Sequence, residues 1–142
     1  MYEPIRTKSV HTMADDSDFP HRTREEELDI QLGGHLAALL AVTDELRELG
    51  DADGQLAGAA EQLAAQVARL RGGRPARADL AGRATDTERG RALHRRAHTI
   101  AGRALVVAAS RADTSAAILA AERMEAHAAA MAATEVAHPA AA

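Results

Sequence analysis

The sequence contains no cysteine and no tryptophan, and its single tyrosine and single phenylalanine, Tyr2 and Phe19, lie close to the N-terminus. The absence of cysteine excludes disulfides, thiolate metal ligands and cysteine nucleophiles. Because the rest of the chain has no aromatic ring, it offers no platform on which unpaired nucleic acid bases could stack and no aromatic wall for a flavin. We therefore expect neither a single-strand nucleic acid binder nor a flavoprotein.

Long apolar runs are also absent. The longest, 104–109, is far too short to span a bilayer, and the N-terminal region has no apolar run of signal-peptide length. These absences predict a soluble, cytoplasmic protein that is not held in a membrane. We also find no nucleophile elbow, phosphate loop, dinucleotide fingerprint or pair of catalytic carboxylates in a known context, so we do not expect an enzyme.

Alanine, by contrast, fills 36 of the 142 positions, and the apolar residues recur at alternating steps of three and four. This spacing is typical of helices that pack along one another, and small side chains let such helices approach closely. The length fits one domain. We predict an all-α fold in which a four-helix bundle over 23–137 lies between a flexible N-terminal tail, 1–22, and a C-terminal tail, 138–142. The expected helices span residues 24–49, 54–71, 86–111 and 114–136.

The first and third helices carry the clearest apolar seams. Thr23 and Glu26 form a capping-box pattern before the first helix, and Gly50 is a candidate left-handed cap after it. Gly33 and Gly34 each cost stability in mid-helix and so require a kink, a close crossing or space for a neighbour. The two seams consist of Leu28, Leu32, His35, Leu39, Val42, Leu46 and Leu49, and of Leu93, Ala97, Ile100, Ala104 and Val107.

Short connections between four helices favour an antiparallel up-down-up-down bundle. The weakest boundary lies near Asp113, where the sequence has neither glycine nor proline. Asp113 is a good N-cap residue and the apolar seam changes phase there, so we expect a turn. The alternative is one continuous helix from Thr85 to about Val136, which would have to dimerise to bury its length.

Four histidines suggest a possible site for a divalent metal ion or haem. His35, His98 and His127 are expected at a similar height in the bundle, and His94 lies four residues before His98, a spacing that can place two imidazoles on one metal. Buried histidines more often serve as hydrogen-bonded core residues that fix the register of helices, and flanking ones are often solvated. We therefore expect no cofactor, and keep a metal or haem site as the alternative.

The net charge of −4 hides two opposed blocks. Residues 23–68 hold two arginines and ten acidic residues, whereas residues 69–111 hold eleven arginines and three acidic residues. Such blocks can pair inside one bundle, or the basic block can face a polyanion. No helix-turn-helix marks the chain, so nucleic acid binding would be non-specific. The candidate basic patch is Arg74, Arg77, Arg83, Arg91 and Arg95.

Several aliphatic residues fall outside the seams and predict a second apolar surface. Such a surface would serve self-association or the docking of a partner helix, unless the registers are slightly different and these residues complete the core. The residues are Ile30, Leu40, Leu105, Val106 and Leu119. The leading interpretation is an interaction or scaffolding module that forms a homodimer or binds a protein partner.

Overall fold

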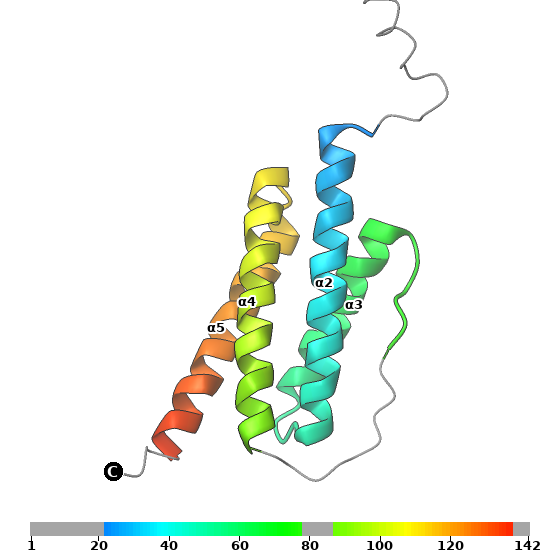
Figure 1. The fold of residues 1–142 in the computed structure, drawn as a ribbon. Coiled ribbons are helices and arrows are strands. Elements are labelled where there is room, and N and C mark those ends of the chain that lie inside the picture. The colour runs from blue at the N-terminus through cyan, green and yellow to red at the C-terminus, as the bar shows by residue number, and fades with distance from the viewer. Residues whose placement is uncertain (1–21, 78–86, 138–142) are drawn as a thin grey trace, which may run out of the picture.

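The computed structural model describes residues 22–77 and 87–137, and these residues form four helices and no strand. The predicted all-α four-helix bundle is therefore confirmed, and each helix begins and ends within one residue of its predicted bounds. No helix in the described ranges is long and apolar enough to cross a membrane. The helices are α2 (Arg24–Leu49), α3 (Gln55–Arg71), α4 (Thr87–Arg111) and α5 (Thr114–Ala137), as Figure 1 shows. The predicted tails fall outside the described residues, apart from Arg22.

Neighbouring helices are antiparallel, as predicted, but the order of directions along the chain differs in one place. The α3 and α4 helices run the same way, and α2 lies between them (Figure 1). The predicted alternation assumed a short connection after α3. At ~3.3 Å per residue, residues 72–86 can span ~50 Å, whereas the 17-residue α3 is only ~26 Å long. The connection is thus long enough to return the chain to the end of the bundle at which α3 began.

Arg77 fastens the first part of this connection to α2. Its guanidinium donates two hydrogen bonds of 2.9 Å to the two carboxylate oxygens of Asp44, a buried residue that also accepts from Arg47. A further donor of Arg77 lies 3.2 Å from Glu61 of α3. This bidentate pair fixes the connection beside α2 and α3 through geometry as well as charge.

Both ends of α2 are capped by the residues that the sequence predicted, but the conformation of Gly50 differs from the prediction. Thr23 and Glu26 form the predicted capping box, in which each side chain accepts the backbone N–H of the other residue, at 3.0 and 2.8 Å. Gly50 caps the other end, but its φ of +147° and ψ of 143° lie outside the left-handed helical conformation that we expected. The N–H of Gly50 still reaches the last carbonyls of α2.

The start of α3 is capped by two acidic side chains, and Asp53 accepts the N–H of Gln55 at 3.1 Å. The two carboxylate oxygens of Asp51 accept the N–H groups of Leu56 and Ala57, at 2.9 and 2.8 Å. A carboxylate at this position satisfies free donors and meets the positive end of the helix dipole.

The chain turns back at Asp113, as predicted. Ala112 adopts a left-handed φ of 59°, the N–H of Asp113 bonds to the carbonyl of Ala108, and the Asp113 carboxylate accepts the N–H of Ala116. The alternative of one continuous helix through this point is therefore wrong.

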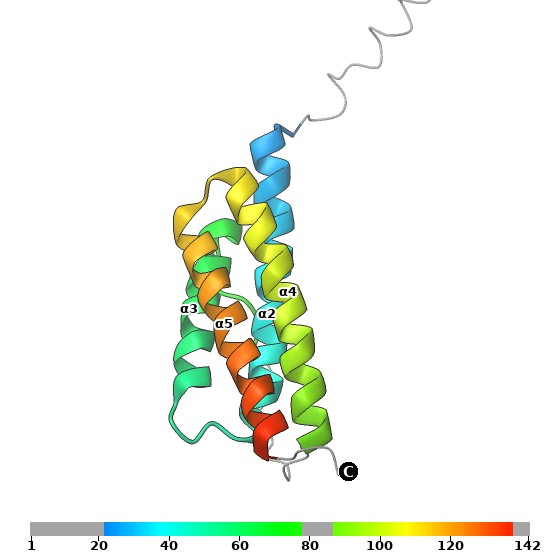
Figure 2. The same ribbon diagram turned by 90° about the vertical axis from the view of Figure 1, so that its left-hand side faces the viewer.

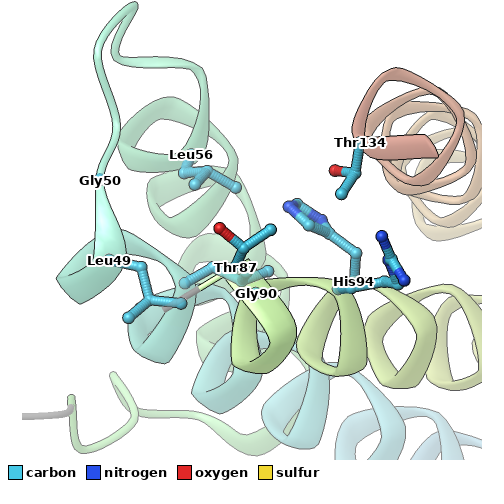
Figure 3. A pocket seen from close by; sticks show the side chains of 9 residues that line it. Leu49, Gly50, Leu56, Thr87, Gly90, His94 and Thr134 are labelled. Carbon is cyan, nitrogen blue, oxygen red and sulfur yellow. The ribbon is translucent and has the colours of Figure 1, made fainter. Parts of the chain in front are cut away.

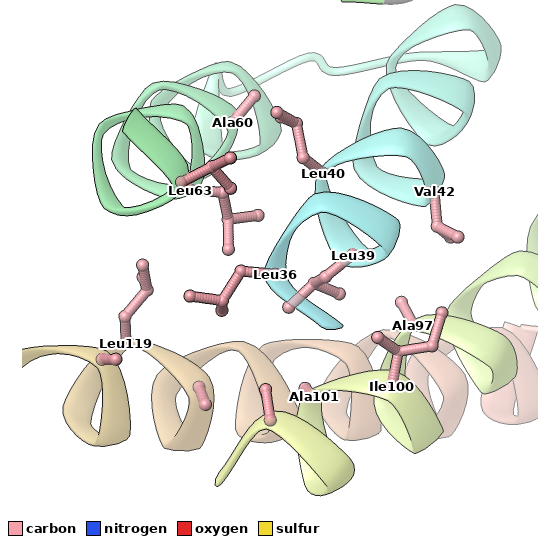
Figure 4. Packing of buried hydrophobic residues seen from close by; sticks show 14 of the residues in the cluster. Leu36, Leu39, Leu40, Val42, Ala60, Leu63, Ala97, Ile100, Ala101 and Leu119 are labelled. Carbon is pink, nitrogen blue, oxygen red and sulfur yellow. The ribbon is translucent and has the colours of Figure 1, made fainter. Parts of the chain in front are cut away.

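The core is built mainly from leucines of α2 and alanines of α4 and α5, which Figure 4 shows meeting between the helices. Two residues predicted for a second apolar surface, Leu40 and Leu119, are buried in this core. For these two residues, the alternative that they complete the core is therefore confirmed. Gly33 is buried where α2 crosses α3, and a Cβ there would lie 3.4 Å from Nε of Arg71, whereas a Cβ on Gly34 would meet nothing within 4 Å.

The two ends of the bundle differ. At the end that contains the α4–α5 turn (Figure 2), Arg111 pairs with Asp29 at 3.0 Å and Arg69 pairs with Asp113 at 2.8 Å. Towards the other end α5 leans away from α3 (Figure 1). We call this other end, where α2 and α5 end and α3 and α4 begin, the open end.

Candidate functional site

Two histidines meet between α4 and α5 in the half of the bundle near the open end. Nδ1 of His94 lies 2.9 Å from Nδ1 of His127, and the ring centroids are 5.1 Å apart with the planes inclined at 46°. A hydrogen bond at this distance requires one ring to donate and the other to accept. At most one of the two Nδ1 atoms therefore carries a proton in this arrangement.

Arg123 lies one helical turn before His127 and is also buried. The side chains of Arg123 and His127 are 7% and 1% exposed, and Nε of Arg123 and Nε2 of His127 have no hydrogen-bond partner. Burial lowers the pKa of Arg123, while the charge of Glu122 acts in the opposite direction. The α5 helix thus directs a guanidinium and an imidazole into the protein without a described carboxylate that accepts their hydrogen bonds.

The same environment disfavours charge on the two imidazoles. Burial, which is the largest cause, and the nearby charges of Arg123, His94 and His98 together lower the pKa of His127 to about 3. Burial also lowers the pKa of His94, again with a contribution from Arg123. Both rings are consequently neutral near pH 7, so the positive charge in this region belongs to arginine.

His94 also lines a pocket of about 200 Å³ at the open end. Figure 3 shows Leu49 and Leu56 on one side of this pocket and His94 and Thr134 on the other. Arg91 lines it as well, and the Nε atom of this arginine is buried without a hydrogen-bond partner. The remaining lining residues are Leu46, Gly50, Thr87 and Gly90. We call this the end pocket; it combines an aliphatic side with a cationic, hydrogen-bonding side.

The structure brings together two of the four histidines predicted for a metal or haem site. His98 is half-buried and close enough to His127 to affect its pKa, but His35 lies in a separate groove between α2 and α4, beside Arg96 and Thr99. Within residues 22–77 and 87–137 no three histidine or acidic side chains are arranged to hold a metal ion. His35 lies beside Thr99 and Ile100 and so near the level of His98, as the seam spacing predicted. The spacing did not predict that His35 faces a different groove from His94 and His127.

The arginines of the predicted basic patch have separate roles. Arg74 and Arg77 pair with Glu61, and Arg77 also pairs with Asp44. Arg95 is exposed on α4, and Arg83 lies outside the described residues. With Arg91 in the end pocket, the described members of the patch do not form one phosphate-binding surface.

The predicted second apolar surface is only partly present. Ile30 and Val106 are 51% and 65% exposed, as expected, while Leu105 is half-buried against the core. Ile118, which was not among the residues predicted for this surface, is 55% exposed and borders a groove between α3 and α5. The groove is lined by Gln62, Ala65, Gln66, Ser115, Ile118, Leu119 and Glu122.

Arg123 is the functional candidate that sequence reasoning missed. Its spacing of four residues before His127 places it on the same face of α5, which is the signal that could have identified it. A charged residue is normally expected on the solvent-exposed face of a helix, and for this reason Arg123 was not predicted to be buried.

A comparison with protein family models, curated proteins and solved structures finds no match to this chain.

Proposed function

We propose that this protein is a cytoplasmic, non-enzymatic interaction module that self-associates through the groove between α3 and α5. The observation that carries this proposal is the exposure of Ile118 at the edge of that groove. In the described chain, Gln66 of α3 donates a hydrogen bond to Ser115 at the start of α5, and Arg69 of α3 donates to Asp113 in the α4–α5 turn. The contact between α3 and α5 is smaller than the contacts of α2 with α3, α2 with α4 and α4 with α5, so this side of the bundle is less closed.

A second copy of the chain is the partner that fits this side. In a two-fold dimer each subunit offers the same surface, so Ile118 of each copy can lie in the groove of the other. The groove is lined by alanine and glutamine side chains, which permit a close approach and supply hydrogen bonds. Burial of an aliphatic side chain that is exposed in the monomer stabilises the dimer.

The test is the molecular mass in solution, measured by light scattering and sedimentation at several concentrations. We expect twice the 14.9 kDa chain mass for the wild type, and a dimer weakened by about tenfold or more in Ile118→Glu, because the dimer would bury a charge. Val106→Glu is the matched control, since Val106 is also more than half exposed but lies on the outer face of α4. A wild type that stays monomeric at every concentration, or two variants that behave alike, contradicts the proposal.

The alternatives receive less support. Arg74 and Arg77 are already paired with carboxylates, which reduces the charge available to nucleic acid phosphates. The metal or haem alternative keeps His94 and His127 but loses His35, which lines a different groove. We therefore propose neither as the function.

A further inference from the structure

We propose that the end pocket binds a small aliphatic carboxylic acid, with its carboxylate held by Arg91 and His94. The hydrocarbon chain of the acid would lie on the aliphatic side of the pocket, formed by Leu46, Leu49 and Leu56. This site is separate from the α3–α5 groove, so it does not depend on self-association.

The first argument is the contrast between Arg91 and the other arginines. Seven arginines of the described chain have a carboxylate within 4 Å: Arg22, Arg47, Arg69, Arg74, Arg77, Arg89 and Arg111. Arg95, one turn after Arg91, is exposed and can be hydrated. Nε of Arg91 is neither paired with a carboxylate nor hydrated, because it is buried and has no acceptor. Buried donors are almost always hydrogen-bonded in native proteins, so the missing acceptor can come from a ligand once the Arg91 side chain shifts to turn Nε towards the end pocket.

The second argument is the charge of the surroundings. Arg123 lies behind the histidine pair with its own Nε buried and unpartnered, and it lowers the pKa of both His94 and His127. None of the residues that line the end pocket is acidic. The missing acceptor is therefore an anion rather than a neutral group, and a carboxylate matches the two-pronged geometry of a guanidinium.

The histidine pair provides a second donor. If His127 donates its Nδ1 proton to Nδ1 of His94, then His94 carries its own proton on Nε2. Figure 3 places the His94 side chain among the residues that line the pocket, so this N–H can donate to a bound carboxylate. His127 and Arg123 then act as positioning residues, because they fix the tautomer and the local charge without lining the pocket.

The size and the walls of the pocket define the rest of the ligand. A water molecule takes up about 30 Å³ of the liquid, and a methylene group is of similar size. A pocket of about 200 Å³ therefore holds about seven such groups, which suits an acid of about six carbon atoms. Three leucines favour a hydrocarbon chain, and the pocket has no Phe, Tyr or Trp side chain on which the ring of an aromatic acid could stack. The site therefore favours short aliphatic acids over aromatic acids, and it repels amines.

The experiment titrates the full chain with sodium hexanoate and follows backbone amide and histidine ring signals by NMR. We expect saturable shifts at residues that line the end pocket, and no such shifts with the neutral methyl hexanoate. Arg91→Gln should weaken hexanoate binding by about 10- to 100-fold, because it removes a hydrogen bond to a charged group. Arg95→Gln is the matched control on the same helix and should change the affinity by less than about twofold.

A second variant tests the pocket in case Arg91→Gln loses binding only because it fails to fold. A Cβ at Gly90 would make only an ordinary contact, 3.6 Å from Leu49, so Gly90→Leu is expected to preserve the helix and to fill the pocket. It should abolish hexanoate binding while the melting temperature is retained. No saturable shift in the wild type, equal affinity for the methyl ester, or equal weakening in Arg91→Gln and Arg95→Gln would overturn the proposal. So would saturable Zn²⁺ binding that is lost in His94→Gln, in a protein that does not respond to hexanoate.

Discussion

The Nδ1 atoms of His94 and His127 face each other at 2.9 Å across the contact between α4 and α5. A pair of this kind is stable only while the two rings share one Nδ1 proton, since two Nδ1–H groups cannot both donate. Its surroundings reinforce that condition, because burial and Arg123 lower the pKa of each ring. The contact is therefore a neutral hydrogen bond in the core of a strongly charged protein.

This pair predicts that acid destabilises the fold through histidine. Below pH 6.5 the unfolded chain binds a proton at His127, whereas the folded chain does not until about pH 3, so the contribution of His127 is fully present above pH 6.5 and is lost as the pH falls towards 3. The loss would be on the order of 4 to 5 kcal/mol at pH 3. His94 acts in the same direction. Urea unfolding between pH 7.5 and 4 measures the effect.

The control for this experiment is His127→Gln, which keeps a polar side chain but cannot titrate. Carboxylates elsewhere also affect acid stability, so the informative quantity is the difference between the two proteins. We expect the free energy of unfolding to fall less steeply with acid in the variant. Parallel curves for the two proteins would show that His127 is not protected from protonation in the folded state.

Arg77 predicts how strongly the connection after α3 is fastened. Replacement of Arg77 by glutamine should lower the free energy of unfolding by about 2 kcal/mol, because it removes a bidentate partner from the buried Asp44. Arg74→Gln serves for comparison, since its pair with Glu61 is exposed and should contribute less than about 1 kcal/mol. Chemical denaturation of the three proteins tests this, and a loss as large in Arg74→Gln as in Arg77→Gln would refute it.

The neighbouring glycines of α2 should respond differently to alanine. Gly34→Ala is expected to raise the free energy of unfolding by up to about 1 kcal/mol, because alanine favours the helix and the new methyl group meets no atom within 4 Å. Gly33→Ala should gain less, since the side chain of Arg71 must yield to it. Thermal melts of both variants provide the measurement. If Gly34→Ala lowers the melting temperature, the space beside Gly34 is not as the structure describes it.

The sequence predicted the helices well because the signals for helix ends are local. Thr23 with Glu26 and the turn at Asp113 depend on residues within a few positions of one another, and the structure has both. The burial of the Leu32 and Leu39 face followed from periodicity in the same way. The second apolar surface was predicted less well, since the buried faces of α2 and α5 are wider than the predicted seams and include Leu40 and Leu119.

The end pocket depends on contacts that no local pattern contains. His94 and His127 are 33 residues apart, and their contact requires the tilt of α5 as well as the turn before it. Arg91 had no sequence feature that separated it from Arg95 and the other exposed arginines of α4. Only the packing around each side chain decided which guanidinium is buried and which is hydrated.

By itself the sequence determined four helices, their bounds and their main apolar faces, because capping and periodicity act within one helix. The tertiary structure decided that α3 and α4 run in the same direction and that His35 lies apart from the other histidines. It also decided that Arg123 is enclosed. The physical reason is that helices joined by a long connection can pair in more than one order, and the choice is made by the sum of many contacts between distant residues.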